Sequence, residues 1–187
     1  VREGDMVIIQ RAGDVIPQIV RVVEEKRDPA STRFTFPTVC PCELQTPIIR
    51  QEGGVVARCS GELACPFQQV ERIRHFVSRD AFDIDGLGEK QVKAFFDREM
   101  IRTPVDIFDL EQNDSKALDP LRRWEGWGEK SVTKLFAAID ARRSIGFDRL
   151  IYGLGIRQIG QATARLLARQ YGGLATWHNA MAAAAAE

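Results

Sequence analysis

The sequence lacks any long run of apolar residues, and none approaches the roughly 20 residues that a membrane-spanning helix needs. We therefore do not expect a membrane protein. The chain also begins without an initiator methionine, a basic segment or a small-residue cleavage site, which argues against a secretory signal peptide. We expect its first residues, VREGDMVII, to be an internal part of a longer protein.

An excess of charge of either sign is absent too, because 26 lysines and arginines balance 26 aspartates and glutamates. Net charge therefore predicts no class of partner, although a basic face can exist within a neutral chain. The remaining composition, 44% apolar and 28% charged, is typical of a soluble globular protein.

Composition divides the 187 residues into three parts. Residues 1–36 are strand-like, with β-branched runs at 6–9 (MVII) and 19–23 (IVRVV) around the turn-like stretch RAGDVIPQ. Residues 37–68 hold all four cysteines around a predicted hairpin of PIIR (47–50) and VVAR (55–58). Residues 69–187 have helical periodicity. The expected fold class is therefore multi-domain and mostly α, with a partial β segment, a small four-cysteine module and a helical domain.

The four cysteines, Cys40, Cys42, Cys59 and Cys65, form two close pairs joined by a hairpin-length segment. Without a secretion signal, this clustering favours zinc ligation over the alternatives of two disulfides or buried thiols. Four thiolates would complete a tetrahedral zinc site and leave no open position, so the metal is expected to be structural. The C-x-C spacing of the first pair makes a tighter chelate ring than C-x2-C.

One signature recurs in the helical part. The stretch IDGLGEKQV at 84–92 returns as WEGWGEKSV at 124–132, and a weaker copy, IRQIGQATARLLA, spans 156–168. In the third copy Gln158 replaces the first glycine, and Gly160 aligns with Gly88. Apolar residues follow each copy at helical spacing, so we expect three helical hairpins. Their first helices are predicted in 71–80, 119–124 and 147–154.

Two glycines around one apolar residue, just before a helix, are typical of a bend that binds an anion. Glycine permits positive φ and close approach by another group, and the first N–H groups of the helix are unpaired. Gly-x-Gly also occurs in ordinary turns between helices, but repetition favours phosphate binding. The predicted contacts are Gly86, Gly88, Lys90, Gly126, Gly128, Lys130, Arg157 and Gly160.

The ligand expected from these bends is the backbone of duplex DNA, because main-chain amides carry no code for bases. In the β segment, Arg11 is a further candidate phosphate contact, with a solvated surface arginine as the alternative. Trp124 and Trp127 either stack on bases or, as we favour, pack between their own helices. His75 and His178 are too isolated to indicate metal binding or catalysis. The arginines in the predicted helices are interpreted as solvated helix faces.

Each copy resembles the helix-hairpin-helix motif of proteins that bind DNA without reading its sequence. The order of modules is more specific, and it closely resembles the middle-to-C-terminal part of bacterial NAD-dependent DNA ligase. The stretch GDMVIIQRAGDVIPQIVRV at 4–22 is similar to the latter half of that family's oligonucleotide-binding (OB) fold domain. The family usually begins its zinc site with C-x2-C, so this chain departs from it at Cys40 and Cys42.

The resemblance implies a nick-sealing reaction. A lysine in a K-x-D-G motif takes AMP from NAD, AMP passes to the 5′-phosphate of a nick, and the 3′-hydroxyl displaces it with help from Mg²⁺. No lysine of this sequence is followed by x-Asp-Gly. We therefore expect NAD, Mg²⁺ and the adenylation chemistry outside this fragment, which would be inactive alone. Its expected role is to grip nicked duplex DNA as a zinc-containing monomer in the bacterial cytoplasm, at the nucleoid.

Three other classes of function remain open. A free-standing helix-hairpin-helix module of DNA repair or recombination would need neither the cysteines nor RAGDVIPQ. A base-removing glycosylase needs a catalytic Asp or Lys after a Gly-Pro-Asp hairpin ending, and no copy has one. In the plainest alternative, the helical domain is an interaction module whose glycines only form turns.

Overall fold

The computed structural model describes residues 1–13, 16–50 and 52–186. Contacts divide the chain into two compact units, Val1–Ser60 and Gly61–Glu187, which we describe separately. The division into three domains, 1–36, 37–68 and 69–187, stays a prediction from the sequence. The multi-domain, mostly helical fold class is confirmed, since the described chain has seven α-helices and two small sheets.

The first unit begins with an antiparallel pair of strands, β1 (Val7–Ala12) and β2 (Ile16–Val22). Their register runs from Val7 opposite Val22 to Ala12 opposite Ile16, with a bulge between Ile8 and Ile9. The two predicted β-branched runs are thus confirmed as strands. Part of the predicted turn, Asp14–Val15, lies outside the described residues. A short 3-10 turn, η1 (Glu24–Lys26), follows β2.

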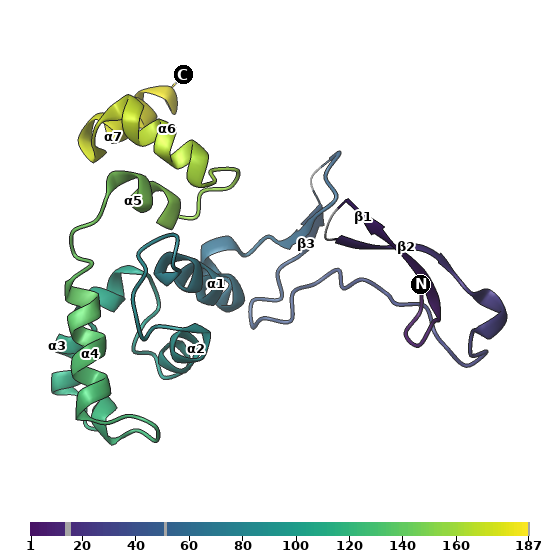
Figure 1. The fold of residues 1–187 in the computed structure, drawn as a ribbon, viewed down its shortest axis with the longest axis horizontal. Coiled ribbons are helices and arrows are strands. Elements are labelled where there is room, and N and C mark those ends of the chain that lie inside the picture. Colours follow the sequence, from purple (N-terminus) through teal and green to yellow (C-terminus); the bar gives the residue numbers. More distant parts are fainter. Residues whose placement is uncertain (14–15, 51, 187) are drawn as a thin grey trace. The chain divides into compact units, whose positions relative to one another are not determined.

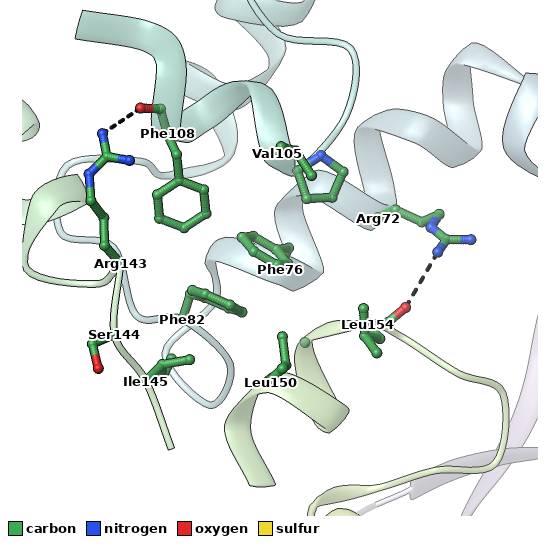
Figure 2. Close-up of a pocket in the computed structure, with 12 residues that line it drawn as sticks. Arg72, Phe76, Phe82, Val105, Phe108, Arg143, Ser144, Ile145, Leu150 and Leu154 are labelled. Carbon is green, nitrogen blue, oxygen red and sulfur yellow. Dashed lines mark hydrogen bonds between the residues drawn. The ribbon is translucent and has the colours of Figure 1, made fainter. Parts of the chain in front are cut away.

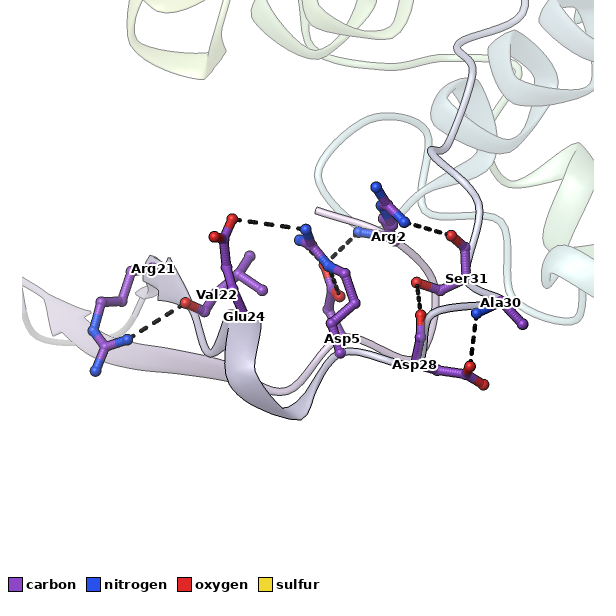
Figure 3. A network of polar contacts seen from close by, with 9 residues as sticks. Arg2, Asp5, Arg21, Val22, Glu24, Asp28, Ala30 and Ser31 are labelled. Carbon is purple, nitrogen blue, oxygen red and sulfur yellow. Dashed lines mark hydrogen bonds and ion pairs between the residues drawn. The ribbon is translucent and has the colours of Figure 1, made fainter.

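Beyond β1 and β2, this unit is held by polar contacts around Asp5. Arg27 donates to both carboxylate oxygens of Asp5, through Nε at 2.8 Å and Nη2 at 3.0 Å. The N–H of Arg2 donates to the same carboxylate at 2.7 Å, and the Arg2 guanidinium reaches the carbonyl of Ser31 (Figure 3). The hydrogen bond from Arg27 is the main cause that lowers the pKa of Asp5 to about 2.

A second two-stranded sheet lies in the cysteine-bearing segment. Strands β3 (Ile48–Arg50) and β4 (Ala57–Cys59) pair antiparallel, with Ile48 opposite Cys59. The predicted hairpin is confirmed, but its second strand begins two residues later than the VVAR run. Val55 and Val56 instead remain exposed in the connection between the strands. Their β-branched side chains raised strand propensity without deciding the pairing.

The second unit contains all the α-helices of the described chain, which Figure 1 shows from blue-teal to yellow in chain order. They are separated by short loops and by the 3-10 turns η2 (Glu62–Ala64), η3 (Val105–Asp109) and η4 (Leu121–Arg123). None is long and apolar enough to cross a membrane. The helices are α1 (Pro66–Val77), α2 (Glu89–Asp97), α3 (Leu110–Lys116), α4 (Glu129–Asp140), α5 (Phe147–Gly153), α6 (Gln161–Tyr171) and α7 (Leu174–Ala184).

The predicted apolar stripes form the core of this unit. The stripe of α2 is fully buried, and that of α4 is buried except for the half-buried Phe136. In α6 only Ala164 is buried, so the third copy is also the weakest in packing. The predicted first helices of the hairpins correspond to α1, to η4 and to α5. The second is a 3-10 turn because Pro120 precedes it and only three residues remain before the bend.

Candidate nucleic-acid interface and metal centre

The three predicted bends share one backbone geometry. At the first position of each, the chain is left-handed: φ is 89° at Gly86, 77° at Gly126 and 66° at Gln158. Gln158 therefore adopts the conformation that glycine provides in the other copies, which explains how the third copy tolerates its loss. The apolar residue that follows donates its N–H three residues back in every copy: Leu87 to Ile84, Trp127 to Trp124 and Ile159 to Ile156, at 3.0–3.2 Å.

The second glycine of each copy caps the next helix. The carbonyls of Gly88, Gly128 and Gly160 accept the first helical hydrogen bonds of α2, α4 and α6. At Gly128 and Gly160 the backbone is extended, and an added Cβ would meet no atom within 4 Å. The fold itself therefore does not require glycine at these two positions. Their missing side chains instead leave the helix N-termini open to an external group.

The basic residues near the bends are all exposed. Within the described chain neither Lys90 nor Lys130 forms an ion pair, so both ammonium groups face solvent beside a helix N-terminus. Arg157 differs, because its guanidinium lies 3.6 Å from a carboxylate oxygen of Glu62. An arriving phosphate would have to compete with that carboxylate at the third bend.

One amide at the second bend already has a partner. The N–H of Gly128 donates to Oγ of Ser131 at 2.9 Å, and the same hydroxyl donates back to the Gly128 carbonyl at 2.8 Å. A phosphate would therefore meet the next amides of the first turn or displace this hydroxyl. Sequence reasoning missed Ser131, although a serine three residues after a helix cap is a recognisable signal.

The first two bends lie next to each other. They line a shared cavity of about 220 Å³ to which Gly86 and Gly126 both contribute. An ion pair of 3.0 Å joins Asp85 of the first bend to Lys134 of α4 across it. Residues around the third bend line a different cavity, with Arg157 and Arg72. The structure thus brings two predicted contacts together and leaves the third in its own setting.

The tryptophans of the second bend pack inward, as favoured from the sequence. Trp124 and Trp127 are half-buried, and their ring centroids lie 5.7 Å and 5.6 Å from that of Phe95 in α2. The indole N–H of Trp124 donates to the carbonyl of Asp119, and the Arg98 guanidinium covers its ring. These rings join the first hairpin to the second.

Several helix arginines hold the bends in place and are not merely solvated. Arg142 donates to both the carbonyl and the carboxylate of Asp83, at 3.2 Å and 2.9 Å, just before the first bend. Arg74 of α1 pairs with Glu89 at the start of α2 at 2.7 Å. The imidazole of His75 bonds to the carbonyl of Tyr152 at 2.7 Å, which gives it a packing role.

Arg11 lies in β1, next to the strand's end and opposite Pro17, with its residue exposed. Gly13 follows with a left-handed φ of 63°, so the chain turns where the sequence predicted. Arg11 belongs to the first unit, whereas the three bends belong to the second.

The four cysteines come together as the sequence predicted. Their Sγ atoms all lie within 4.8 Å of one another, with Cys40, Cys42 and Cys65 buried and Cys59 half-buried. Sulfur atoms about 2.3 Å from a tetrahedral zinc ion lie roughly 3.8 Å apart, so the cluster needs only a small contraction to hold one. Two turns with a left-handed residue, Gln45 and Glu62, arrange the pairs. This group can bind a metal despite the C-x-C spacing.

Comparison with known proteins identifies similar domains and relatives for this chain. The profile of the NAD-dependent DNA ligase OB-fold domain matches residues 1–31, and that of the helix-hairpin-helix motif matches residues 149–185. A protein named DNA ligase from Afipia carboxidovorans is 55% identical over the whole chain, and one from Nitrobacter winogradskyi is 54% identical over 99% of it. The DNA ligase of Caulobacter vibrioides is 58% identical over 91% of the chain.

The fold and the matched modules define a class: mostly helical chains with an OB-type ligase segment, a cluster of four cysteines and helix-hairpin-helix motifs. The chain spans about a quarter of the length of these relatives, 26% of the first two. Along its whole length it is similar to part of these proteins named DNA ligase, and residues 1–31 match the OB-fold domain of NAD-dependent DNA ligases.

Proposed function

We propose that this chain is the duplex-gripping part of an NAD-dependent DNA ligase. In the whole protein it would hold nicked DNA while the missing adenylation segment performs the chemistry with NAD and Mg²⁺. Gripping raises the rate by keeping the 3′-hydroxyl and the activated 5′-phosphate in line, which is a proximity effect. We also propose that the protein acts as a monomer, and that it works in the cytoplasm at the nucleoid.

The observation that carries this proposal is the repeated bend whose capping glycine the fold does not need. At Gly128 and Gly160 a side chain would fit, yet both positions have none. Such open helix N-termini suit phosphate oxygens, and the nearby basic side chains supply charge. Backbone amides give no base recognition, so binding is expected to be independent of sequence. The proposed contacts are Arg11, Gly86, Gly88, Lys90, Gly126, Gly128, Lys130, Arg157 and Gly160.

Zinc is the metal proposed for the cysteine cluster, held by Cys40, Cys42, Cys59 and Cys65. When bound, it would supply a rigid cross-link and no open position for a substrate. The chain's own contribution is to place the four thiolates on two turns and a short hairpin. Zinc analysis of the reduced protein tests this directly, and about one ion per chain is expected.

Salt dependence tests the grip. Binding of the chain to a fluorescently labelled nicked duplex is measured between roughly 50 and 200 mM salt, where phosphate contacts weaken steeply. If Arg11, Lys90, Lys130 and Arg157 each neutralise one phosphate, log K should fall against log salt with a slope of about −3.6. A slope near zero, or equal binding to an uncharged backbone analogue, would contradict the proposal.

The parent protein tests the link to ligation. Removal of residues 69–187 from the full-length enzyme should abolish nick sealing while self-adenylation with NAD continues. Sealing at an unchanged rate would contradict a gripping role. A free-standing repair module is not favoured, because the similarity to DNA ligases covers the whole chain and includes the OB-fold segment.

A further inference from the structure

One sizeable cavity of the second unit lies apart from the first two bends. It has a volume of about 670 Å³ and contains no residue of the segments 84–90 or 124–130. Its walls come from α1 and the loop after it, from η3, from the segment after α4, and from α5 (Figure 2). Nothing in the proposed DNA grip uses it.

The floor of this cavity is aromatic and aliphatic. Phe76 and Phe82 are buried and stack on each other with ring centroids 3.8 Å apart, and Phe108 packs edge-on against both. Phe76 and Phe82 each use one face on the other and are almost fully buried, so they offer little surface for stacking a nucleobase. A base would also leave its hydrogen-bonding edge unpaired against an apolar wall. The floor therefore favours apolar side chains as the occupant.

The rim is basic at both ends. Figure 2 shows Arg143 and Arg72 on opposite sides of the floor, with Phe76, Phe82 and Leu150 between them. No Asp or Glu is among the lining residues. Arg143 is oriented by the carbonyl of Phe108 at 2.6 Å and pairs with Asp140. Arg72 forms no ion pair within the described chain, and only a long bond of 3.4 Å reaches the Leu154 carbonyl. Arg72 therefore has an uncompensated charge that complements an anion at its end of the floor, whereas the charge of Arg143 is already paired with Asp140.

The apolar surface continues beyond the cavity. Val105 on the rim is 68% exposed, and Leu154 on the other side is 36% exposed. A small molecule that fits the cavity would leave this rim uncovered, whereas a polypeptide segment would cover it. We propose that this cavity, which we call the α1–α5 groove, docks an acidic segment of a partner protein, with apolar side chains on the floor and a flanking carboxylate at Arg72.

A displayed library of random 12-residue peptides, selected against the full-length protein, tests this inference without presupposing a partner. The enriched peptides should share apolar residues flanked by Asp or Glu, and they should bind by fluorescence anisotropy at low micromolar or weaker affinity. Absence of enrichment, or enrichment of basic or purely polar peptides, would overturn the proposal. So would enriched peptides that bind equally well when the groove is altered.

Two substitutions alter the groove at exposed positions. Arg72→Glu places a carboxylate where the peptide's carboxylate should lie, and like-charge repulsion should weaken binding about tenfold or more. Val105→Glu should have a similar effect by adding charge to the apolar rim. Leu118→Glu is the matched control, because Leu118 is 98% exposed and lies outside the groove. The control should retain peptide binding, and if it weakens binding as much as Val105→Glu, the groove is not the site.

DNA binding separates this proposal from the grip. Val105→Glu should leave the affinity for nicked duplex unchanged, since Val105 belongs to none of the bends, and this also shows that the variant is folded. If the bends do not bind DNA at all, the peptide result stands on its own. If peptide and duplex instead compete for every variant, the peptides mimic DNA at the bends, and the docking proposal fails.

Discussion

The two units of this chain are stabilised in different ways. Gly61–Glu187 has a continuous apolar core of residues from α1 to α4, whereas the buried apolar residues described in Val1–Ser60 are Cys40 and Cys42. Strands β1 and β2 leave Ile9, Ile16 and Val20 at least half exposed. The first unit therefore depends on its three clustered cysteines, backbone pairing and ion pairs, and the second on burial of apolar surface. The difference predicts which perturbation each unit resists.

Metal removal is expected to have the largest effect, and only around the cysteines. Structural zinc contributes about 10–16 kcal/mol of apparent binding free energy in small zinc peptides. A chelator should therefore unfold the β3–β4 hairpin and expose it to protease, while helical circular dichroism from the second unit remains. Cys59→Ser should behave like the chelated protein, and Ser60→Ala is its neighbouring control. Equal protease resistance with and without metal would show that the cluster is not what holds this segment.

The converse experiment targets the apolar core. Phe95 is fully buried and contacts both Trp124 and Trp127, so Phe95→Ala should lower the free energy of unfolding of the second unit by about 3–5 kcal/mol. All three tryptophans lie in this unit, so denaturant unfolding followed by fluorescence reports it alone. Phe67→Ala, at a 57% exposed position, is the control and should cost under about 0.5 kcal/mol. Similar losses for both variants would mean that the second unit has no dominant core.

Acid should weaken the first unit before the core of the second. The folded-state pKa of Asp5 is lowered from 3.8 to about 2, so its ion pair with Arg27 contributes full stability above pH of about 4. That contribution is lost as the pH falls through about 2, because the carboxyl takes up a proton. Amide NMR signals of β1 and β2 should broaden or shift in this window. Asp5→Asn should remove the pH dependence, and an unchanged profile would show that the ion pair is not a support of this unit.

Structural features that are local and that recur along the chain could be predicted from the sequence. The spacing of the three copies predicted the bends, and the alignment of Gln158 with Gly86 and Gly126 matches the left-handed backbone at all three. Long-range side-chain pairs could not be predicted, because nothing near Asp83 in the sequence points to Arg142, 59 residues away. The start of β4 was also misplaced, since strand pairing and not local propensity set it.

The smallest expected effect on stability separates two glycines of one bend. Gly126 has a left-handed φ of 77°, so Gly126→Thr should cost about 1–2 kcal/mol through backbone strain. Gly128 is extended and caps α4 with open space around it, and threonine is about as good a helix cap as glycine. Gly128→Thr should therefore change the free energy of unfolding by under about 0.5 kcal/mol.

DNA binding should rank this pair differently. The threonine side chain at position 128 would stand where a phosphate oxygen approaches the first turn of α4, so Gly128→Thr should weaken duplex binding without lowering stability. Gly126→Thr serves as the comparison, since any loss of its affinity comes with loss of fold. Tryptophan fluorescence and anisotropy on the same samples measure both quantities. If Gly128→Thr binds duplex with full affinity, no phosphate approaches the first turn of α4 at this position. The proposed contact at Gly128 would then be wrong.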